Sequence, residues 1–178
     1  MTSVELVGSR AEGRAHSLSD WDLHVRTDDF PRLAEDLPGL LELAGPLGQF
    51  WDPYSDHDAY MVILPGPAKL DICFFERARE WSQPWEVGAD TLEAIDIHFW
   101  DWILWTEQKR RGGNAEKVRT SLANMFERML RPMGVADPPE TVGEALDAYL
   151  HARDRLEREF GISVPRTLER EVRPAIAT

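Results

Sequence analysis

Apolar and polar residues alternate along much of the first 75 residues, a pattern typical of strands that bury one face. Tyr60 to Leu64 and Lys69 to Phe75 are the two clearest runs, and Pro65-Gly66-Pro67 between them predicts a turn. The same reading predicts shorter strands at residues 4–7, 20–25 and 49–54. The beginning of the chain is therefore expected to form a sheet.

One helix is expected within this series, at residues 28–43. Asp28 or Asp29 is placed to cap it, and Pro31 lies in its first turn, where the missing N–H costs nothing. Gly45 follows the last helical residue, as is common at helix ends.

The spacing of apolar residues becomes helical from about residue 91. Leu92, Ile95 and Phe99 begin a helix that Gly112-Gly113 ends. Two further helices are predicted at 114–133 and 141–160, the last opening on Thr141 and Glu144 at the spacing of a capping box. The pattern thus predicts an α/β domain over residues 1–85 and a helical domain over residues 90–178.

Composition and charge narrow the range of functions. Of the 178 residues, 43% are hydrophobic, which is enough for a buried core. The formal net charge of −12 argues against nucleic acid as a partner and favours a cationic small molecule. No apolar run reaches membrane length, and the single Cys73 fits a reducing cytoplasm.

The residues best suited to bind a metal ion or a phosphate lie near the start of the chain. Asp20 and Asp22 are two positions apart on a predicted strand, so their carboxylates project from one face and need a cation between them, for which Mg²⁺ is the usual solution. Upstream, Gly8 lacks a Cβ and lets a phosphate approach the backbone, while the hydroxyl of Ser9 can donate to it. A phosphate site facing a metal site is the resulting hypothesis.

Asp71 adds a third acid. It lies between Leu70 and Ile72 on a predicted strand and therefore faces away from both. Beside the strand of Asp20 and Asp22, it would complete a cluster able to hold two metal ions for in-line phosphoryl chemistry. We also expect Asp71 to accept the proton of an attacking hydroxyl.

Gly8-Ser9, Asp20-x-Asp22 and the distal Asp71 together resemble the polymerase-beta-like nucleotidyltransferase superfamily. The form Gly-Ser-Arg-Ala-x-Gly followed by Ser-Asp-Trp-Asp-Leu is most similar to the aminoglycoside and lincosamide nucleotidyltransferases. The resemblance covers residues 4–75. It implies an α+β fold with a mixed sheet and flanking helices, two Mg²⁺ ions, and transfer of a nucleoside monophosphate, AMP from ATP, to a hydroxyl of a small acceptor.

The resemblance also assigns residues to the nucleotide. We expect Gly8 and Ser9 to hold the β and γ phosphates, and Arg10 to reach the triphosphate or to stay on the surface. The resemblance implies that basic residues of the helical domain also reach the triphosphate; Lys109 or Arg111 is the candidate, although cations favour a helix C-terminus whatever the function. In the family a helix normally precedes the Gly-Ser strand, whereas here that strand begins almost at the first residue.

Two alternatives remain open on the sequence. Some small nucleotidyltransferases resemble antitoxins that adenylylate a partner protein, although the helical domain here is larger than such minimal antitoxins carry. The other alternative is a nucleotide-binding module without turnover, which the three mutually repelling carboxylates disfavour. The identity of the acceptor, the preferred nucleotide and the oligomeric state are not encoded in a short motif.

Overall fold

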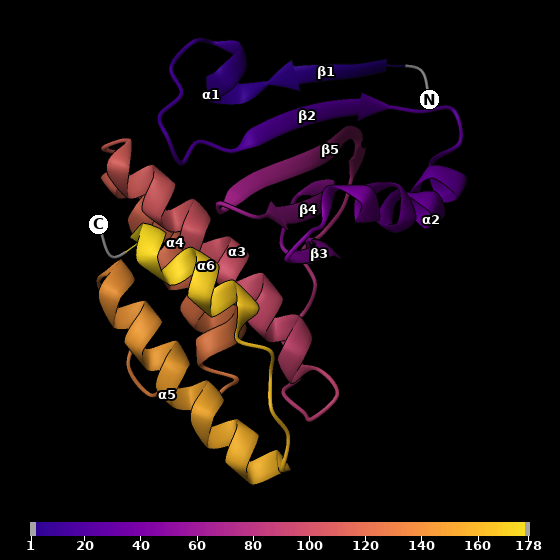
Figure 1. Cartoon of the computed structure of the whole chain (residues 1–178). Helices are drawn as coiled ribbons and strands as arrows, with labels where there is room; N and C mark the ends of the chain where they lie inside the picture. Colours follow the sequence, from indigo (N-terminus) through magenta and orange to yellow (C-terminus); the bar gives the residue numbers. More distant parts are fainter. Residues whose placement is uncertain (1–2, 177–178) are drawn as a thin grey trace. The chain divides into compact units, whose positions relative to one another are not determined.

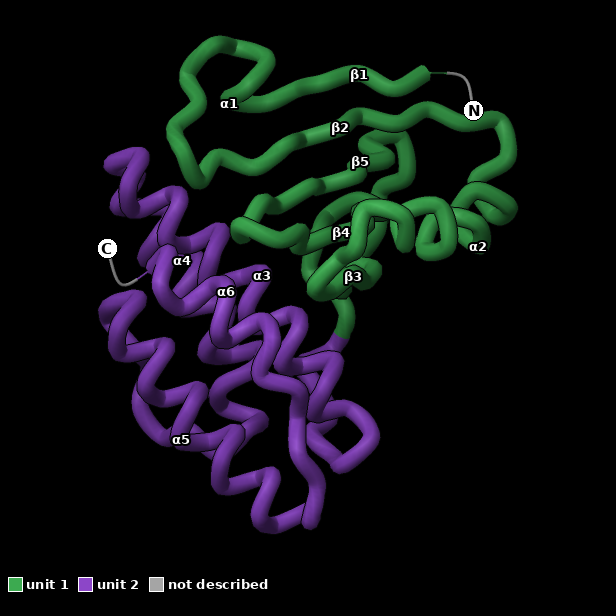
Figure 2. The backbone as a smooth tube through the Cα atoms, viewed as in Figure 1, with its two compact units in different colours: residues 1–82 green, residues 83–178 purple. Residues whose placement is uncertain are grey.

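The computed structural model of the protein describes residues 3–176 and divides the chain into two compact units (Figure 2). The first unit spans residues 1–82 and contains all of the strands assigned between residues 3 and 176. The second unit spans residues 83–178, and its regular elements are helical. This composition confirms the predicted fold class, a mixed sheet with flanking helices followed by C-terminal helices.

The first unit contains five strands and two α-helices: β1 (Ser3–Val7), α1 (Gly8–Ala11), β2 (Trp21–Arg26), α2 (Phe30–Leu41), β3 (Gly48–Trp51), β4 (His57–Leu64) and β5 (Ala68–Ala78). The predicted strands are all present, with shifted ends. The predicted helix at 28–43 begins later, because Asp29 is its cap and accepts from the backbone N–H of Arg32 at 3.2 Å. A 3-10 turn at Glu42–Ala44 then leads to Gly45 in the left-handed conformation.

The strands form one mixed sheet in the order β1-β2-β5-β4-β3 (Figure 1). β2 and β5 are parallel neighbours, whereas the β1–β2, β4–β5 and β3–β4 pairs are antiparallel. The turn predicted at residues 65–67 joins β4 to β5, where Leu64 pairs with Ala68. In the parallel pair, Asp22 is the register partner of Asp71.

One face of the sheet carries the hydrophobic core of the first unit. Buried side chains from β2, β4 and β5, including Tyr60, Val62 and Phe74, pack with Leu37 of α2. Phe30 of α2 makes an edge contact with Phe74, with ring centroids 5.0 Å apart. The amphipathic helix α2 therefore covers this face, which buries the alternate residues of each strand.

The other face of the sheet carries a small apolar cluster and acidic residues. A small apolar cluster of Ala59, Met61 and Cys73 lies there. Because side chains alternate along a strand, this is also the face of Asp22 on β2 and Asp71 on β5. The acids thus share a face of the sheet that is distinct from the one that α2 covers.

The second unit contains α3 (Leu92–Arg111), α4 (Ala115–Met125), α5 (Val142–Phe160) and α6 (Thr167–Ile176). The helix predicted at 114–133 changes character, because α4 passes into a π-helical turn at Phe126–Leu130. The capping box is also altered: Thr141 accepts from the N–H of Glu144, but the Glu144 carboxylate accepts from the N–H of Glu140. Between residues 3 and 176, no helix combines the length and apolarity needed to cross a bilayer.

A buried acid joins two helices of this unit. Asp96 of α3 is 2% exposed, and its Oδ1 accepts from Trp100 Nε1 at 3.1 Å and from the Tyr149 hydroxyl at 2.5 Å. Tyr149 belongs to α5 and stacks on Phe99, with ring centroids 3.6 Å apart. Arg153, also on α5, lies 3.4 Å from the same oxygen. Asp96 is therefore the centre of a polar network within the helical core.

Candidate functional site

Three carboxylates converge at the end of the β2–β5 pair. Asp22 and Asp71 are brought together by the parallel register, and Asp20 lies directly before β2. One oxygen from each carboxylate lies within 4.8 Å of the other two. Asp20 and Asp71 are 3% and 6% exposed, so much of this negative charge is held away from bulk water. The structure therefore brings together the three acids that the sequence predicted as a cluster.

The close approach of Gly8 shapes one side of this cluster. Gly8 follows β1, has a φ of +69°, and begins the single-turn helix α1. A Cβ on Gly8 would overlap the carboxylate of Asp22, with the Asp22 Cγ at 2.9 Å. The missing side chain thus leaves the space in which the Asp22 carboxylate lies. Ser9 follows directly in α1, and its contact with a phosphate stays a prediction.

Arg10 makes contacts that the sequence did not indicate. Its Nε donates to the carbonyl of Asp20 at 2.9 Å, and its Nη2 donates to the carbonyl of Ser19 at 2.6 Å. The guanidinium also lies over the ring of Trp21, 4.2 Å from its centroid. Arg10 therefore fixes the backbone that leads into β2. Its predicted contact with a triphosphate is not among these interactions and stays a prediction.

Lys69 is a residue of this site that the sequence analysis missed. It is 2% exposed, and its Nζ lies 2.5 Å from Asp71 Oδ1 and 3.4 Å from Met61 Sδ. The signal was available in the sequence, because Lys69 precedes Asp71 by two positions on a strand and so shares its face. A buried cation is thus in direct contact with the third acid.

The thiol of Cys73 lies next on the same face. Burial raises its pKa to about 12, and the charges of Asp71 and Asp22 add to this effect. The thiol therefore stays protonated at neutral pH, which fits a small buried side chain and not a metal-binding thiolate.

A second polar group lies further along β2. The Nε2 of His24 is 3.0 Å from both carboxylate oxygens of Glu76, and Arg26 Nε donates to the same carboxylate at 2.9 Å. The hydrogen bond from His24 lowers the pKa of Glu76 to about 2, with a smaller contribution from Arg26. These three side chains link β2 to β5 beyond the acidic cluster.

Lys109 and Arg111 belong to the second unit, at the end of α3. Lys109 Nζ lies over the ring of Trp105, 4.7 Å from its centroid. Arg111 binds Glu107 at 2.8 Å and the backbone carbonyl of Ala175 at 2.5 Å. Both residues make contacts within the helical unit, and their assignment to a triphosphate stays a prediction.

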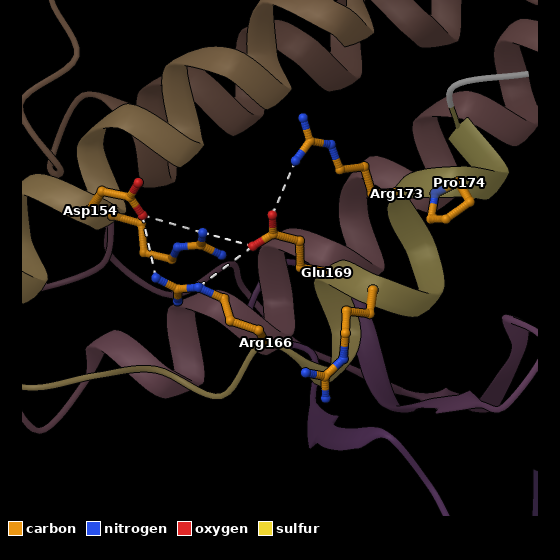
Figure 3. A pocket seen from close by; sticks show the side chains of 7 residues that line it. Asp154, Arg166, Glu169, Arg173 and Pro174 are labelled. Atoms are coloured by element: carbon orange, nitrogen blue, oxygen red, sulfur yellow. Dashed lines mark hydrogen bonds and ion pairs between the residues drawn. The ribbon is translucent and has the colours of Figure 1, made fainter.

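The helical unit also has a shallow pocket of about 410 Å³ between α5 and α6, shown in Figure 3. Four arginines line it; Arg153, Arg166 and Arg173 have carboxylate partners within the unit, and Arg170 donates to the Thr167 hydroxyl at 3.4 Å. Arg166 binds Glu157 at 2.5 Å, and Arg173 binds Glu169 at 3.2 Å. Arg153 binds Glu169 at 2.8 Å. The Arg153–Glu169 pair ties α5 to α6, and the lining as a whole holds four arginines and two carboxylates, those of Asp154 and Glu169.

The donor set of the acidic cluster suits a hard divalent cation. Carboxylate oxygens are the ligands that Mg²⁺ prefers, and three of them converge here without a thiolate or imidazole among them. Asp20, Asp22 and Asp71 therefore fit a magnesium site.

Comparison with known proteins finds a likeness among solved structures. Neither a protein-family model nor a curated protein matches the sequence. Among solved structures, an aminoglycoside 6-adenyltransferase from Bacillus subtilis is similar over 89% of this chain and 88% of its own, with 10% identity and a TM-score of 0.36.

Proposed function

We propose that this protein is a metal-dependent nucleotidyltransferase that transfers AMP from ATP to a hydroxyl of a small, cationic acceptor. The observation that carries the proposal is the convergence of three carboxylates within 4.8 Å on parallel neighbours of a mixed sheet. Carboxylates held this close repel one another unless a cation neutralises them. Without a bound cation, the repulsion within such a cluster would destabilise the folded state.

Each acid has a role in the proposal. Asp20 and Asp22 would hold two Mg²⁺ ions, with Asp71 on the second. Bound there, the ions would neutralise the negative charge of the triphosphate. Asp71, next to the incoming acceptor, would accept the proton of its hydroxyl. The acceptor oxygen then bonds to the α-phosphorus, the bond between the α-phosphorus and its bridging oxygen breaks, and pyrophosphate leaves.

The glycine before α1 has a positioning role in this scheme. Because Gly8 has no side chain, a phosphate would approach its backbone beside the Asp22 carboxylate, which itself occupies the space of the missing Cβ. Ser9 would donate its hydroxyl to the same phosphate, and Arg10 would keep the backbone of Asp20 in place. Lys109 and Arg111 are proposed to supply further positive charge to the triphosphate.

The choice of acceptor follows from charge. The chain carries a net charge of −12, so a cationic acceptor such as an aminoglycoside-like or lincosamide-like compound would be attracted to it and a polyanion would be repelled. Nucleic acid is therefore not proposed as a substrate. A cytoplasmic location, where a lone thiol stays reduced, fits the proposal.

The proposal is tested by pyrophosphate release from each of the four nucleoside triphosphates with Mg²⁺, across a panel of aminoglycosides, lincosamides and aminocyclitols. We expect release that depends on one acceptor class and on ATP. Asp22→Asn should lower it by more than about 100-fold, since a metal ligand is lost, while thermal unfolding shows the variant folded.

Asp36→Asn is the matched control, because Asp36 is an exposed acid of α2 that pairs only loosely with Arg32, at 3.7 Å. It should leave release unchanged. Full activity in Asp22→Asn would contradict the mechanism. ATP binding without release across the panel would instead favour adenylylation of a partner protein or a nucleotide-binding module without turnover.

A further inference from the structure

Lys69 is the structural feature of the candidate site that the proposed reaction leaves without a role. Its side chain is 1% exposed, and that of Asp71, its partner, is 8% exposed. The two residues lie on the same face of β5, with Nζ and Oδ1 2.5 Å apart. Burying an ammonium group is costly without an opposite charge at close range, so this position of Lys69 depends on Asp71.

The charge of Lys69 acts on its surroundings beyond Asp71. At Asp52, desolvation raises the pKa of the carboxyl, and the charge of Lys69 lowers it while that of Asp71 raises it. Lys69 thus opposes the effect of Asp71 at a neighbouring carboxyl group.

We propose that Lys69 is a fixed counter-charge of the acidic cluster, which stabilises Asp20, Asp22 and Asp71 before a cation arrives and keeps their affinity for a free divalent cation low. The inference rests on the proposed function, because it assigns a regulatory role to the same site. Lys69 is a positioning residue, since it acts through Asp71. The consequence of this counter-charge is that Mg²⁺ binds at the site mainly together with the nucleotide.

The physical reason is charge balance. With Lys69 present, the three carboxylates and the ammonium carry less net negative charge than the carboxylates alone. An ammonium near the cluster also repels an incoming cation, and one oxygen of Asp71 is already engaged as an acceptor. A unit charge about 4 Å from a bound cation changes its affinity by roughly fivefold at the dielectric of bulk water and by far more at an effective dielectric of about 20, so we expect a change of at least about tenfold.

The test compares the wild type with Lys69→Met, which keeps an unbranched side chain but removes the charge. Mn²⁺ alone is the probe, with no nucleotide present. Its binding is followed by electron paramagnetic resonance, and thermal unfolding is measured with and without it. Lys117→Met is the matched control, because Lys117 is an exposed lysine of α4 with no role in the cluster.

We expect Lys69→Met to unfold at a lower temperature than the wild type in the absence of Mn²⁺. Its Kd for Mn²⁺ should fall by at least about tenfold, and Mn²⁺ should raise its Tm more than that of the wild type. Lys117→Met should match the wild type in all three quantities. An equal or weaker response of Lys69→Met to Mn²⁺ would overturn the inference.

A second background, Asp71→Asn, shows whether Lys69→Met lowers stability through the lost charge pair or through a general loss of folding. In Asp71→Asn the buried ammonium has lost its carboxylate, so adding Lys69→Met to this background should cost little or raise the Tm. A cost as large as in the wild type would also overturn the inference. Because no nucleotide is used, failure of the pyrophosphate assay with these results intact would count against the proposed function alone.

Discussion

Gly8 and Asp22 are adjacent across the β1–β2 pair, and the Asp22 carboxylate occupies the space that a Cβ on Gly8 would fill. The residue before Gly8, Val7, is the register partner of Asp22. The position of one cluster acid therefore depends on the absence of a side chain on the residue that follows the neighbouring strand.

Gly8→Ala tests this dependence. The new methyl group should displace the Asp22 carboxylate and abolish most of the stabilisation that Mn²⁺ gives, in addition to the cost of about 1–2 kcal/mol for a non-glycine residue in the left-handed region. Gly13→Ala is the control, because Gly13 has nearly the same φ, +68°, but nothing within 4 Å of a Cβ. Thermal unfolding with and without Mn²⁺ separates the two effects. An equal Mn²⁺ response in both variants would contradict the argument.

Arg10→Ala should lower the free energy of unfolding by about 1–3 kcal/mol, because the carbonyls of Ser19 and Asp20 lose a charged donor. Urea denaturation measures the change. Arg14→Ala is the comparison, since Arg14 is exposed and pairs with Glu12 on the surface, and its loss should cost about 0.5 kcal/mol or less. Equal costs for the two variants would rule out the positioning role of Arg10.

Glu76→Gln should show a pH-dependent loss of stability. The folded pKa of about 2 lies below the ordinary value of 4.5, so the carboxylate stabilises the fold fully above about pH 4.5. This contribution is lost as the pH falls from 4.5 towards 2. The difference in Tm between wild type and Glu76→Gln should therefore be largest at neutral pH and shrink in acid. Glu80→Gln, an exposed change on the same segment, should show no such trend.

Tyr149→Phe should lower the free energy of unfolding by about 1–3 kcal/mol, because Asp96 loses a donor in the core. Burial raises the pKa of Tyr149 well above 10, so the hydroxyl remains protonated and donates across the accessible pH range. Calorimetric unfolding provides the measurement. In an Asp96→Asn background the same change should cost less, and an undiminished cost there would show that the loss comes from packing alone.

The faces of the strands on which the acids lie were predictable because they follow from local rules, whereas the β2–β5 pairing that brings Asp71 to Asp22 joins segments distant in the sequence. Side chains two apart on a strand share a face, and the turn at residues 65–67 fixed the pair of strands that carries Asp71. The fold class followed from the change of hydrophobic period near residue 91. These features depend on spacing along the chain, which the sequence displays directly.

Other features depend on partners distant in the sequence or on local competition. Arg10 binds the carbonyls of Ser19 and Asp20, and a composition pattern does not indicate which backbone groups a guanidinium will reach. The π-helical turn at Phe126–Leu130 interrupts a sequence with ordinary helical spacing. Helix α6 was missed although its signal was present, since Leu168, Val172 and Ile176 are spaced four apart and all are buried.

The parallel pairing of β2 with β5 has a consequence for the order in which the protein acquires its chemistry. In the chain, α2, β3 and β4 lie between the two strands. During synthesis Asp22 therefore emerges well before Asp71, and it has no partner acid across the sheet until β5 has left the ribosome and docked. Affinity for a divalent cation would then appear only when the whole first unit has folded, which makes cation binding a reporter of completed folding.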